Sequence, residues 1–228
     1  MSYTYKYPRP AVTVDCLIFT YLPDEASLRV LLIQRKNPPF QDMWAFPGGF
    51  IEMDEPPLAA AHRELQEETG LTLPYLRQFH TFGKVDRDPR GRTISITYYG
   101  FVRPHDVTHL AAADDAAHLD WFDVRQLPEL AFDHRDVFEE AWRQLQQRLR
   151  FFPVDRYLLP DTFTRAQLQT LYGIFLGEPP AAEAFVAWMA QTGLYPPTGQ
   201  DETYHLHPET YVRTIEWGLD HPLPFRPL

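Results

Sequence analysis

The sequence has a single cysteine and no long apolar run. Cys16 is the only cysteine among 228 residues, so an intrachain disulfide is excluded. No stretch approaches the roughly 20 apolar residues that a membrane-spanning helix needs. The opening segment MSYTYKYPRP lacks the apolar core of a secretory leader. We therefore expect a cytoplasmic protein without a membrane partner, and we expect Cys16 to be a buried core thiol.

Positive charge is also scarce. The chain holds 21 lysines and arginines against 31 aspartates and glutamates, which gives a net charge of -10. This balance argues against non-specific binding of nucleic acid or anionic membrane over the whole surface, although it leaves a local basic patch open. The length fits one large domain, or one domain with a small companion.

Apolar periodicity predicts an α+β domain over residues 1–150. A first helix is expected to begin after Asp54 as its N-cap and to end at Gly70, and a second covers 137–149. The expected strands are 3–7, 11–21, 28–35, 71–74, 79–85, 93–102 and 119–123. Strands, one helix, more strands and a closing helix favour an α/β/α sandwich with a mixed sheet.

The composition changes after about Arg150. Residues 151–160 contain two prolines and are typical of a linker. Beyond them we expect helices at 164–176 and 181–191, then a small hairpin formed by 203–206 and 210–215. Two tightly joined short helices followed by a hairpin are the outline of a winged helix. The second domain is therefore expected over 151–228.

Three acidic residues share one face of the first expected helix. At about 100° per residue, Glu64, Glu67 and Glu68 fall within an arc of about 100°. Their mutual repulsion is tolerated most easily when a cation neutralises them, and oxygen ligands select hard ions such as Mg²⁺ or Mn²⁺. A backbone carbonyl at Gly48 or Gly49 is a further candidate ligand. A solvated acidic helix face explains the same spacing.

The context of these acids resembles a known family. The run GFIEMDEPPLAAAHRELQEETGL, residues 49–71, resembles the Nudix box in full. The resemblance implies a Nudix fold over about residues 11–150. It also implies a metal-dependent pyrophosphohydrolase whose substrate is a nucleoside diphosphate linked to another group, with ADP-ribose favoured. The fixed positions of the box are Gly49, Glu55, Arg63, Glu64, Leu65, Glu67, Glu68, Gly70 and Leu71.

Each part of the box has an expected role. Metal ions held by the acids would neutralise the diphosphate, orient it and acidify a bound water. Glu55 and Arg63 are expected to form an ion pair that fixes the loop, while Gly49 and Gly70 shape the ends of the motif. Glu64 or Glu68 is a candidate base. Asp115, in the loop before Trp121, is another candidate, and a surface loop acid is its alternative interpretation.

Two further groups are candidates for binding the substrate. Arg87, Arg90 and Arg92 lie in the segment GKVDRDPRGR, and their guanidinium forks suit phosphate oxygens. The alternative is a turn with solvated arginines. Phe46 is a candidate for stacking on a base, as are Phe50 and Phe82, although phenylalanines in such positions are more often simply core residues.

The resemblance extends beyond the first domain. LAFDH at 130–134, LLPDTFTRAQLQTLY at 158–172 and GEPP at 177–180 look like Nudix-related transcriptional regulators. Such proteins join a metabolite-sensing Nudix domain to a C-terminal winged helix, which implies a homodimer. This sequence departs from that pattern in its intact box. It also departs in the segment EPPAAEAFVAWMAQTG, where the recognition helix is expected without any lysine or arginine.

The charge of the second domain decides between two functions. From Phe151 onward there are four basic and nine acidic residues, a net charge of -5. DNA affinity rests largely on cationic contacts to phosphate. We therefore expect weak DNA binding, with the second domain serving dimerisation or covering the active site. Hydrolysis is the leading hypothesis. The alternative is a DNA-binding regulator that uses the Nudix domain as a metabolite sensor.

Overall fold

The computed structural model describes residues 6–107, 116–199 and 201–221. Within them the chain forms two compact units. The first comprises the described residues within 1–18, 30–100 and 109–141, and the second those within 19–29, 101–108 and 142–228. A domain boundary at residue 150 stays a prediction, whereas these units interleave along the chain. No helix in the described ranges is long and apolar enough to cross a membrane.

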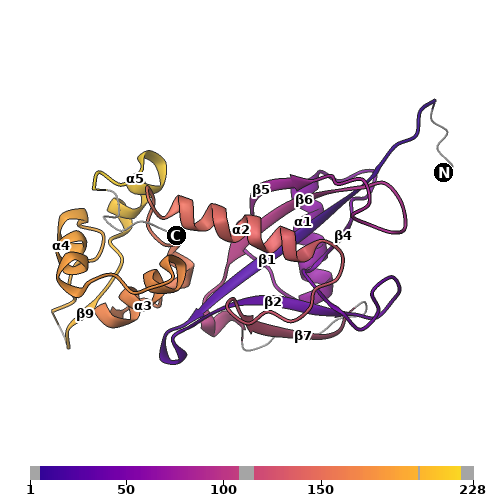
Figure 1. Cartoon of the computed structure of the whole chain (residues 1–228). Helices are drawn as coiled ribbons and strands as arrows, with labels where there is room; N and C mark the ends of the chain where they lie inside the picture. The colour runs from indigo at the N-terminus through magenta and orange to yellow at the C-terminus, as the bar shows by residue number, and fades with distance from the viewer. Residues whose placement is uncertain (1–5, 108–115, 200, 222–228) are drawn as a thin grey trace. The chain divides into compact units, whose positions relative to one another are not determined.

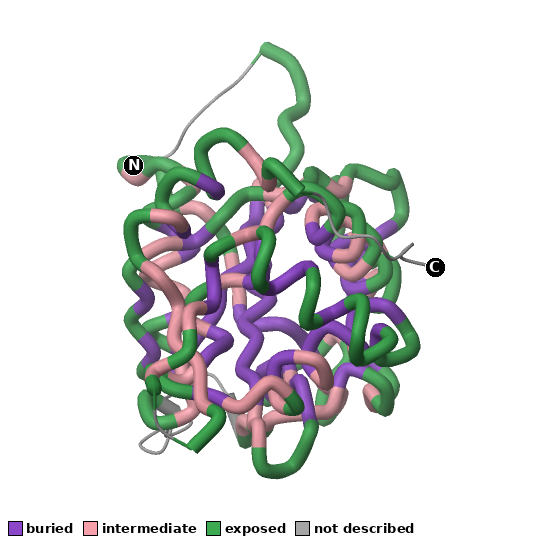
Figure 2. Tube along the Cα trace, turned by 90° about the vertical axis from the view of Figure 1, so that its left-hand side faces the viewer, coloured by how far each residue is buried: buried purple, intermediate pink, exposed green. Residues whose placement is uncertain are grey.

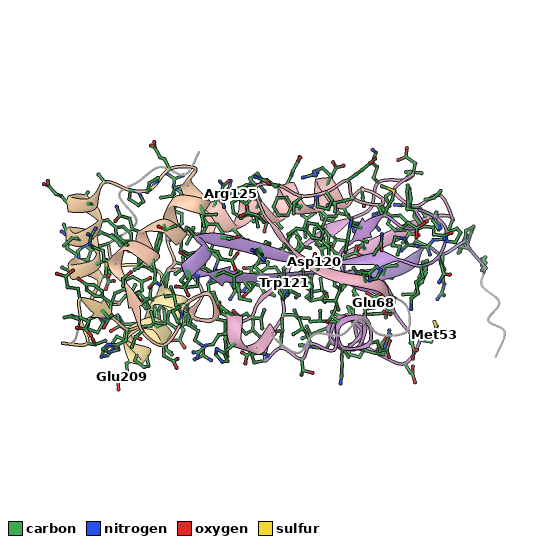
Figure 3. The ribbon with its side chains drawn as sticks, turned by 90° about the horizontal axis from the view of Figure 1, so that it is seen from below. Met53, Glu68, Asp120, Trp121, Arg125 and Glu209 are labelled. Atoms are coloured by element: carbon green, nitrogen blue, oxygen red, sulfur yellow. The ribbon has the colours of Figure 1, made fainter. Side chains whose placement is uncertain are left out.

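One seven-stranded sheet is built from the described residues, with the path β3-β2-β1-β6-β5. β4 (Gly48–Phe50) pairs antiparallel with β1, and β7 pairs with β2. Figures 1 and 3 show the sheet between α1 (Pro57–Thr69) on one side and the start of α2 (His134–Arg148) on the other, which confirms the expected sandwich. The remaining strands are β1 (Ala11–Leu22), β2 (Ser27–Arg35), β3 (Trp44–Ala45), β5 (Arg77–Phe82), β6 (Thr93–Phe101) and β7 (Ala116–Asp123).

The core follows from the apolar strands. Every residue from Val14 to Tyr21 is buried, because β1 is central in the sheet and covered on both faces. Cys16 is fully buried, as predicted, and burial raises the pKa of its thiol well above the usual value. In Figure 2 the buried stretches lie inside the trace and the exposed ones form its outer loops.

Three local predictions for the first unit were wrong. Helix α1 begins at Pro57 with Pro56 as its N-cap, so Asp54 is not the cap. Residues 71–74 form no strand, because the apolar side chains of Leu71 and Leu73 are buried without sheet pairing of the backbone. Residues Trp44–Ala45 form β3, which is not among the strands expected from the sequence. The strand expected at residues 3–7 lies mostly outside the described residues, and Lys6 and Tyr7 form a bend.

The second unit packs around an aromatic centre. Helix α3 (Arg165–Leu176) lies where a helix was expected and buries Leu168, Leu171, Tyr172 and Phe175. Helix α4 (Ala182–Thr192) adds Phe185 and Trp188, and the hydroxyl groups of Tyr172 and Tyr195 lie 3.2 Å apart. Two-residue strands β8 (Phe163–Thr164) and β9 (Thr203–Tyr204) pair antiparallel.

The hairpin expected near the end of the second unit was wrong. Residues Pro208–Trp217 form helix α5, and β9 pairs with β8 instead. His207 caps the helix by accepting a hydrogen bond from the backbone N–H of Thr210, and Pro208 suits the first turn. Tyr211 and Thr214 are buried three residues apart, which is helical spacing. Capping by His207 and burial of Tyr211 and Thr214 therefore favour a helix where a strand was expected.

We predict that the start of α3 contributes measurably to stability. Thr164 and Gln167 form a reciprocal capping box, in which Thr164 Oγ1 accepts from Gln167 N at 3.2 Å. Replacing Thr164 with alanine should lower the free energy of unfolding by about 1 kcal/mol, because the backbone N–H of Gln167 loses its hydrogen-bond acceptor. Urea unfolding of T164A measures this, with exposed Thr162→Ala as the control. Equal losses in both variants would contradict the capping argument.

Candidate active site

The acidic face of α1 is held together by one arginine. Arg63 Nε and Nη2 donate to the two carboxylate oxygens of Glu55, at 3.1 and 2.6 Å. Its Nη1 donates to Glu64 Oε1 at 2.8 Å and to Glu67 Oε2 at 3.0 Å. The predicted Glu55–Arg63 ion pair is therefore present. Arg63 is in addition the counter-cation of two of the three candidate metal ligands.

Two glycines bring the preceding strand close to the same helix. Gly48 N donates to Glu68 Oε2 at 2.8 Å, which ties β4 to α1. A Cβ built on Gly49 would lie within 2.6 Å of all three carboxylate atoms of Glu64, and one on Gly48 would collide with the carbonyl oxygen of Val14. Only glycine allows this approach. Gly70 ends α1 with a φ of 74°, the left-handed conformation typical of a helix C-cap.

The three acids differ in their exposure. Glu68 is buried and Glu64 is partly buried, and both line a pocket of about 370 Å³ in the first unit. Burial raises the pKa of Glu64, and the neighbouring Arg63 opposes this shift. The Glu67 side chain is 58% exposed and is not part of the pocket lining. The helix face predicted from the spacing therefore exists, but only Glu64 and Glu68 of its three acids line the pocket.

The oxygen ligands fit a hard divalent cation. The carboxylates of Glu64 and Glu68 lie at the pocket wall. The backbone of Gly48 and Gly49 lies close to them and lines the same pocket. In the described part of the chain, no three histidine, cysteine or acidic side chains are arranged to hold an ion. The chemistry of the ligand set fits Mg²⁺ or Mn²⁺.

The predicted arginines have three different environments. Arg87 is buried and forms a bidentate pair with Asp133, at 2.9 and 2.7 Å. Arg90 pairs with Asp88 at 2.7 Å, and its side chain is 43% exposed in the pocket wall. Arg92 donates to the backbone carbonyls of Lys84 and Thr93 and is outside the pocket lining. The structure therefore brings two of the three arginines to the pocket.

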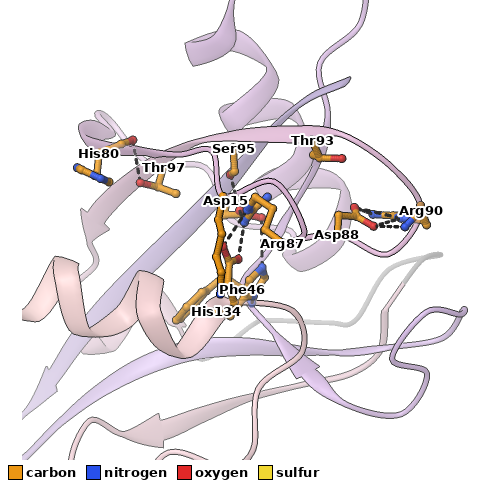
Figure 4. Close-up of polar contacts among 12 residues, drawn as sticks. Asp15, Phe46, His80, Arg87, Asp88, Arg90, Thr93, Ser95, Thr97 and His134 are labelled. Carbon is orange, nitrogen blue, oxygen red and sulfur yellow. Dashed lines mark hydrogen bonds and ion pairs between the residues drawn. The ribbon is translucent and has the colours of Figure 1, made fainter. Parts of the chain in front are cut away.

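The floor of the pocket is a buried polar network that sequence reasoning missed. Asp15 accepts a hydrogen bond from Ser95 Oγ and lies 3.6 Å from both Arg87 Nη2 and His134 Nε2 (Figure 4). Phe46 N donates to His134 Nδ1 at 3.0 Å, so the neutral ring carries its proton on Nε2, toward Asp15. Burial lowers the pKa of His134, with Asp15 opposing the shift.

The remaining predicted residues are placed as follows. Phe46 is buried, stacks on His134 with ring centroids 5.3 Å apart and lines the pocket, as does Phe50. Phe82 is not among the lining residues. Asp115 lies outside the described residues. The missed lining residues include Asp15, Arg35, Asp88, Phe132 and His134. The motif LAFDH contains two of them, and Asp88 lies in the segment GKVDRDPRGR, so sequence signals existed for three of these residues.

Comparison with known proteins agrees with this geometry. The model of the NUDIX domain matches residues 10–141. The ADPR responsive transcriptional repressor NtrR of Acinetobacter baylyi is 35% identical over 222 residues, covering 96% of this chain and 87% of the relative. The ADP-ribose pyrophosphatase of Methanocaldococcus jannaschii is 41% identical over 137 residues, covering 60% of this chain and 76% of the relative.

A solved structure extends the similarity through the second unit. Shewanella oneidensis NrtR complexed with a 27mer DNA superposes with a TM-score of 0.74 and 30% identity, covering 93% of this chain and 99% of that one. A small winged-helix-like unit, in addition to the sandwich, is therefore part of the shared fold. Taken with the domain match and the site on α1, this likeness means that the chain belongs to the Nudix family and resembles its transcriptional regulators along nearly its whole length.

Proposed function

We propose that the first unit is a Mg²⁺- or Mn²⁺-dependent pyrophosphohydrolase acting on a nucleoside diphosphate linked to a second group. The observation that carries this is the position of Glu64 and Glu68, which line the pocket beside Gly48 and Gly49. ADP-ribose is the favoured substrate, because relatives named for responding to it or cleaving it match this chain at 35% and 41% identity.

The residues of the site have separate proposed roles in metal binding, positioning and substrate binding. Glu64, Glu67, Glu68 and the carbonyl of Gly48 would hold the metal, which supplies charge neutralisation and an acidified water when bound. Arg63 forms ion pairs with Glu64 and Glu67 on α1 and with Glu55 in the preceding loop, which holds the loop against the helix. Arg87, Arg90, Arg92 and Phe46 are the proposed substrate-binding residues, with Arg87 held rigidly by Asp133. Glu64, Glu68 and Asp115 remain candidates for the base.

We expect hydrolysis to depend on the acids of α1. Replacing Glu68 or Glu67 with glutamine removes a negative charge while keeping the size of the side chain. Turnover of ADP-ribose with Mg²⁺ should fall about 100-fold or more, because stabilisation of the transition-state charge by a bound metal contributes several kcal/mol. The measurement is steady-state release of AMP and ribose 5-phosphate.

The matched control is Glu139→Gln, which changes an exposed acid on α2 outside the pocket lining. It should retain wild-type turnover. If the wild type hydrolyses no nucleoside diphosphate derivative with either metal, the proposed reaction is wrong.

A DNA-binding regulator is the second candidate function. The observation that favours it is similarity over 96% of the chain to a repressor and over 93% to a structure complexed with DNA. The charge of the second unit opposes it. The exposed positions of α4 include Glu183, Val186, Ala187 and Ala190, and no lysine or arginine occurs in this helix. We propose that any DNA binding by this unit is weak.

A mobility-shift assay separates these two candidates. At about 150 mM salt we expect no tight complex with the region upstream of the protein's own operon. The second unit has few lysine or arginine side chains that could contact DNA phosphates and displace their counterions. A random duplex of equal length is the control. A nanomolar complex with the upstream region alone, dissociated by ADP-ribose, would establish the regulator and refute the weak-binding proposal.

We further propose that the chain is a cytoplasmic homodimer, on the basis of its resemblance to the regulators. Size-exclusion chromatography with light scattering should give about twice the 26.7 kDa mass of one chain. A mass that stays at one chain over the micromolar range would contradict this assembly.

A further inference from the structure

The pocket is lined by four arginines, and three of them already have carboxylate partners. Arg63 pairs with Glu55, Arg87 with Asp133 and Arg90 with Asp88. The fourth, Arg35, follows a different pattern. It is the last residue of β2 and lies half-buried at the pocket wall. Arg35 is therefore the lining arginine that has no ion pair with a carboxylate in the described part of the chain.

All the close partners of Arg35 are neutral. Its Nε donates to Pro39 O at 2.9 Å, and its Nη2 donates to Asn37 O at 3.3 Å. Within the described ranges no carboxylate oxygen lies within 4.0 Å of its guanidinium nitrogens, and Nη1 has no hydrogen-bond partner. A desolvated cation that lacks a counter-ion is costly unless a ligand supplies one.

The guanidinium is held firmly in this position. The backbone of Arg35 donates to Met43 O at 3.0 Å and accepts from Asp42 N at 2.9 Å, which closes the loop that supplies both carbonyl partners. Its guanidinium carbon lies 4.7 Å from the centroid of the Phe132 ring. Phe132 has a φ of 53°, a left-handed conformation that phenylalanine rarely adopts and that is more frequent at functional sites.

A second cation contacts the same ring. The guanidinium carbon of Arg90 lies 5.5 Å from the centroid of Phe132 and 5.1 Å from that of Phe50. Burial and the positive charge of Arg90 lower the pKa of Arg35, and the carboxylates of Glu68, Asp88 and Asp15 oppose this shift. An anion placed beside Arg35 would relieve both effects.

We propose that Arg35 is a ligand-binding residue of this pocket and that its free Nη1 donates to an anionic phosphate oxygen of the bound nucleoside diphosphate derivative. The identity of that ligand rests on the proposed function. The geometry requires only an anionic oxygen. A planar guanidinium with one nitrogen free, and the others fixed by backbone carbonyls, is oriented before the ligand arrives.

The test is calorimetric titration of the full chain with ADP-ribose and with inorganic pyrophosphate, in EDTA, so that no metal contributes. Arg35→Gln keeps a polar side chain but removes the charge. We expect it to weaken the binding of both anions about 10- to 100-fold, the range typical of a lost hydrogen bond to a charged group. Arg35→Lys restores the charge without the fork and should recover part of the loss.

The control variant is Arg125→Gln, which removes an exposed arginine that pairs with Asp123 outside the pocket lining. It should bind both anions as the wild type does. Thermal unfolding of each variant detects a purely structural role, in which Arg35→Gln and Arg35→Lys would lower the midpoint and the affinity together. Circular dichroism confirms that each variant is folded.

The inference is overturned if the wild type binds neither anion, if Arg35→Gln binds both with wild-type affinity, or if Arg35→Lys is no better than Arg35→Gln. These outcomes are separate from the fate of the proposed function. Binding that depends on Arg35 in a protein without turnover would refute hydrolysis and keep the contact. Turnover that is lost in Glu68→Gln but unaffected by Arg35→Gln would support hydrolysis and refute the Arg35 contact.

Discussion

The site depends on the contacts of Arg63 with three acids. Glu64 and Glu67 share one helix face, where their like charges destabilise α1 when no cation is present. Arg63 donates to both, and its other two nitrogens bind Glu55 in the loop before the helix. One guanidinium therefore neutralises the acids and fixes the entry to α1. Without it, Glu64 and Glu67 would lose their shared cationic partner, and the loop at Glu55 would lose its ion pair with α1.

The opposite side of the pocket is built on a different principle. Here Asp15, Asp133 and Arg87 are buried or partly buried, and charge is balanced by pairing inside the protein. Removing one member of such a pair leaves an uncompensated buried charge, which commonly costs about 3–5 kcal/mol. The charges of the floor are therefore balanced within the protein. The wall that contains Arg35 retains positive charge for a ligand.

The difference between these two sides explains what the sequence could and could not predict. The acids, Arg63 and the glycines lie within 23 residues, so a helix and a turn are enough to bring them together. Ser95 and Asp15 are 80 residues apart, and Phe46 and His134 are 88 apart. No local spacing predicts such contacts, because the pairing of β1 with β6 and the entry of α2 create them. Helix α5 was missed for a different reason, since its local capping by His207 and the burial of Tyr211 and Thr214 outweighed the β-prone residues.

The choice between enzyme and sensor cannot be made from the acids alone, because a sensor also has to bind the diphosphate. What separates the two functions is where the binding energy is used. A hydrolase needs interactions that strengthen in the transition state, and the carboxylates of α1 with a metal are of this kind. A sensor needs contacts that hold the ground state of the ligand, and a fixed cation such as Arg35 is enough for that. This chain has both kinds of residue in one pocket. Repulsion among the acids destabilises α1, and Arg63 must offset it. A protein that only senses the ligand has no need of these acids. Their presence therefore favours hydrolysis.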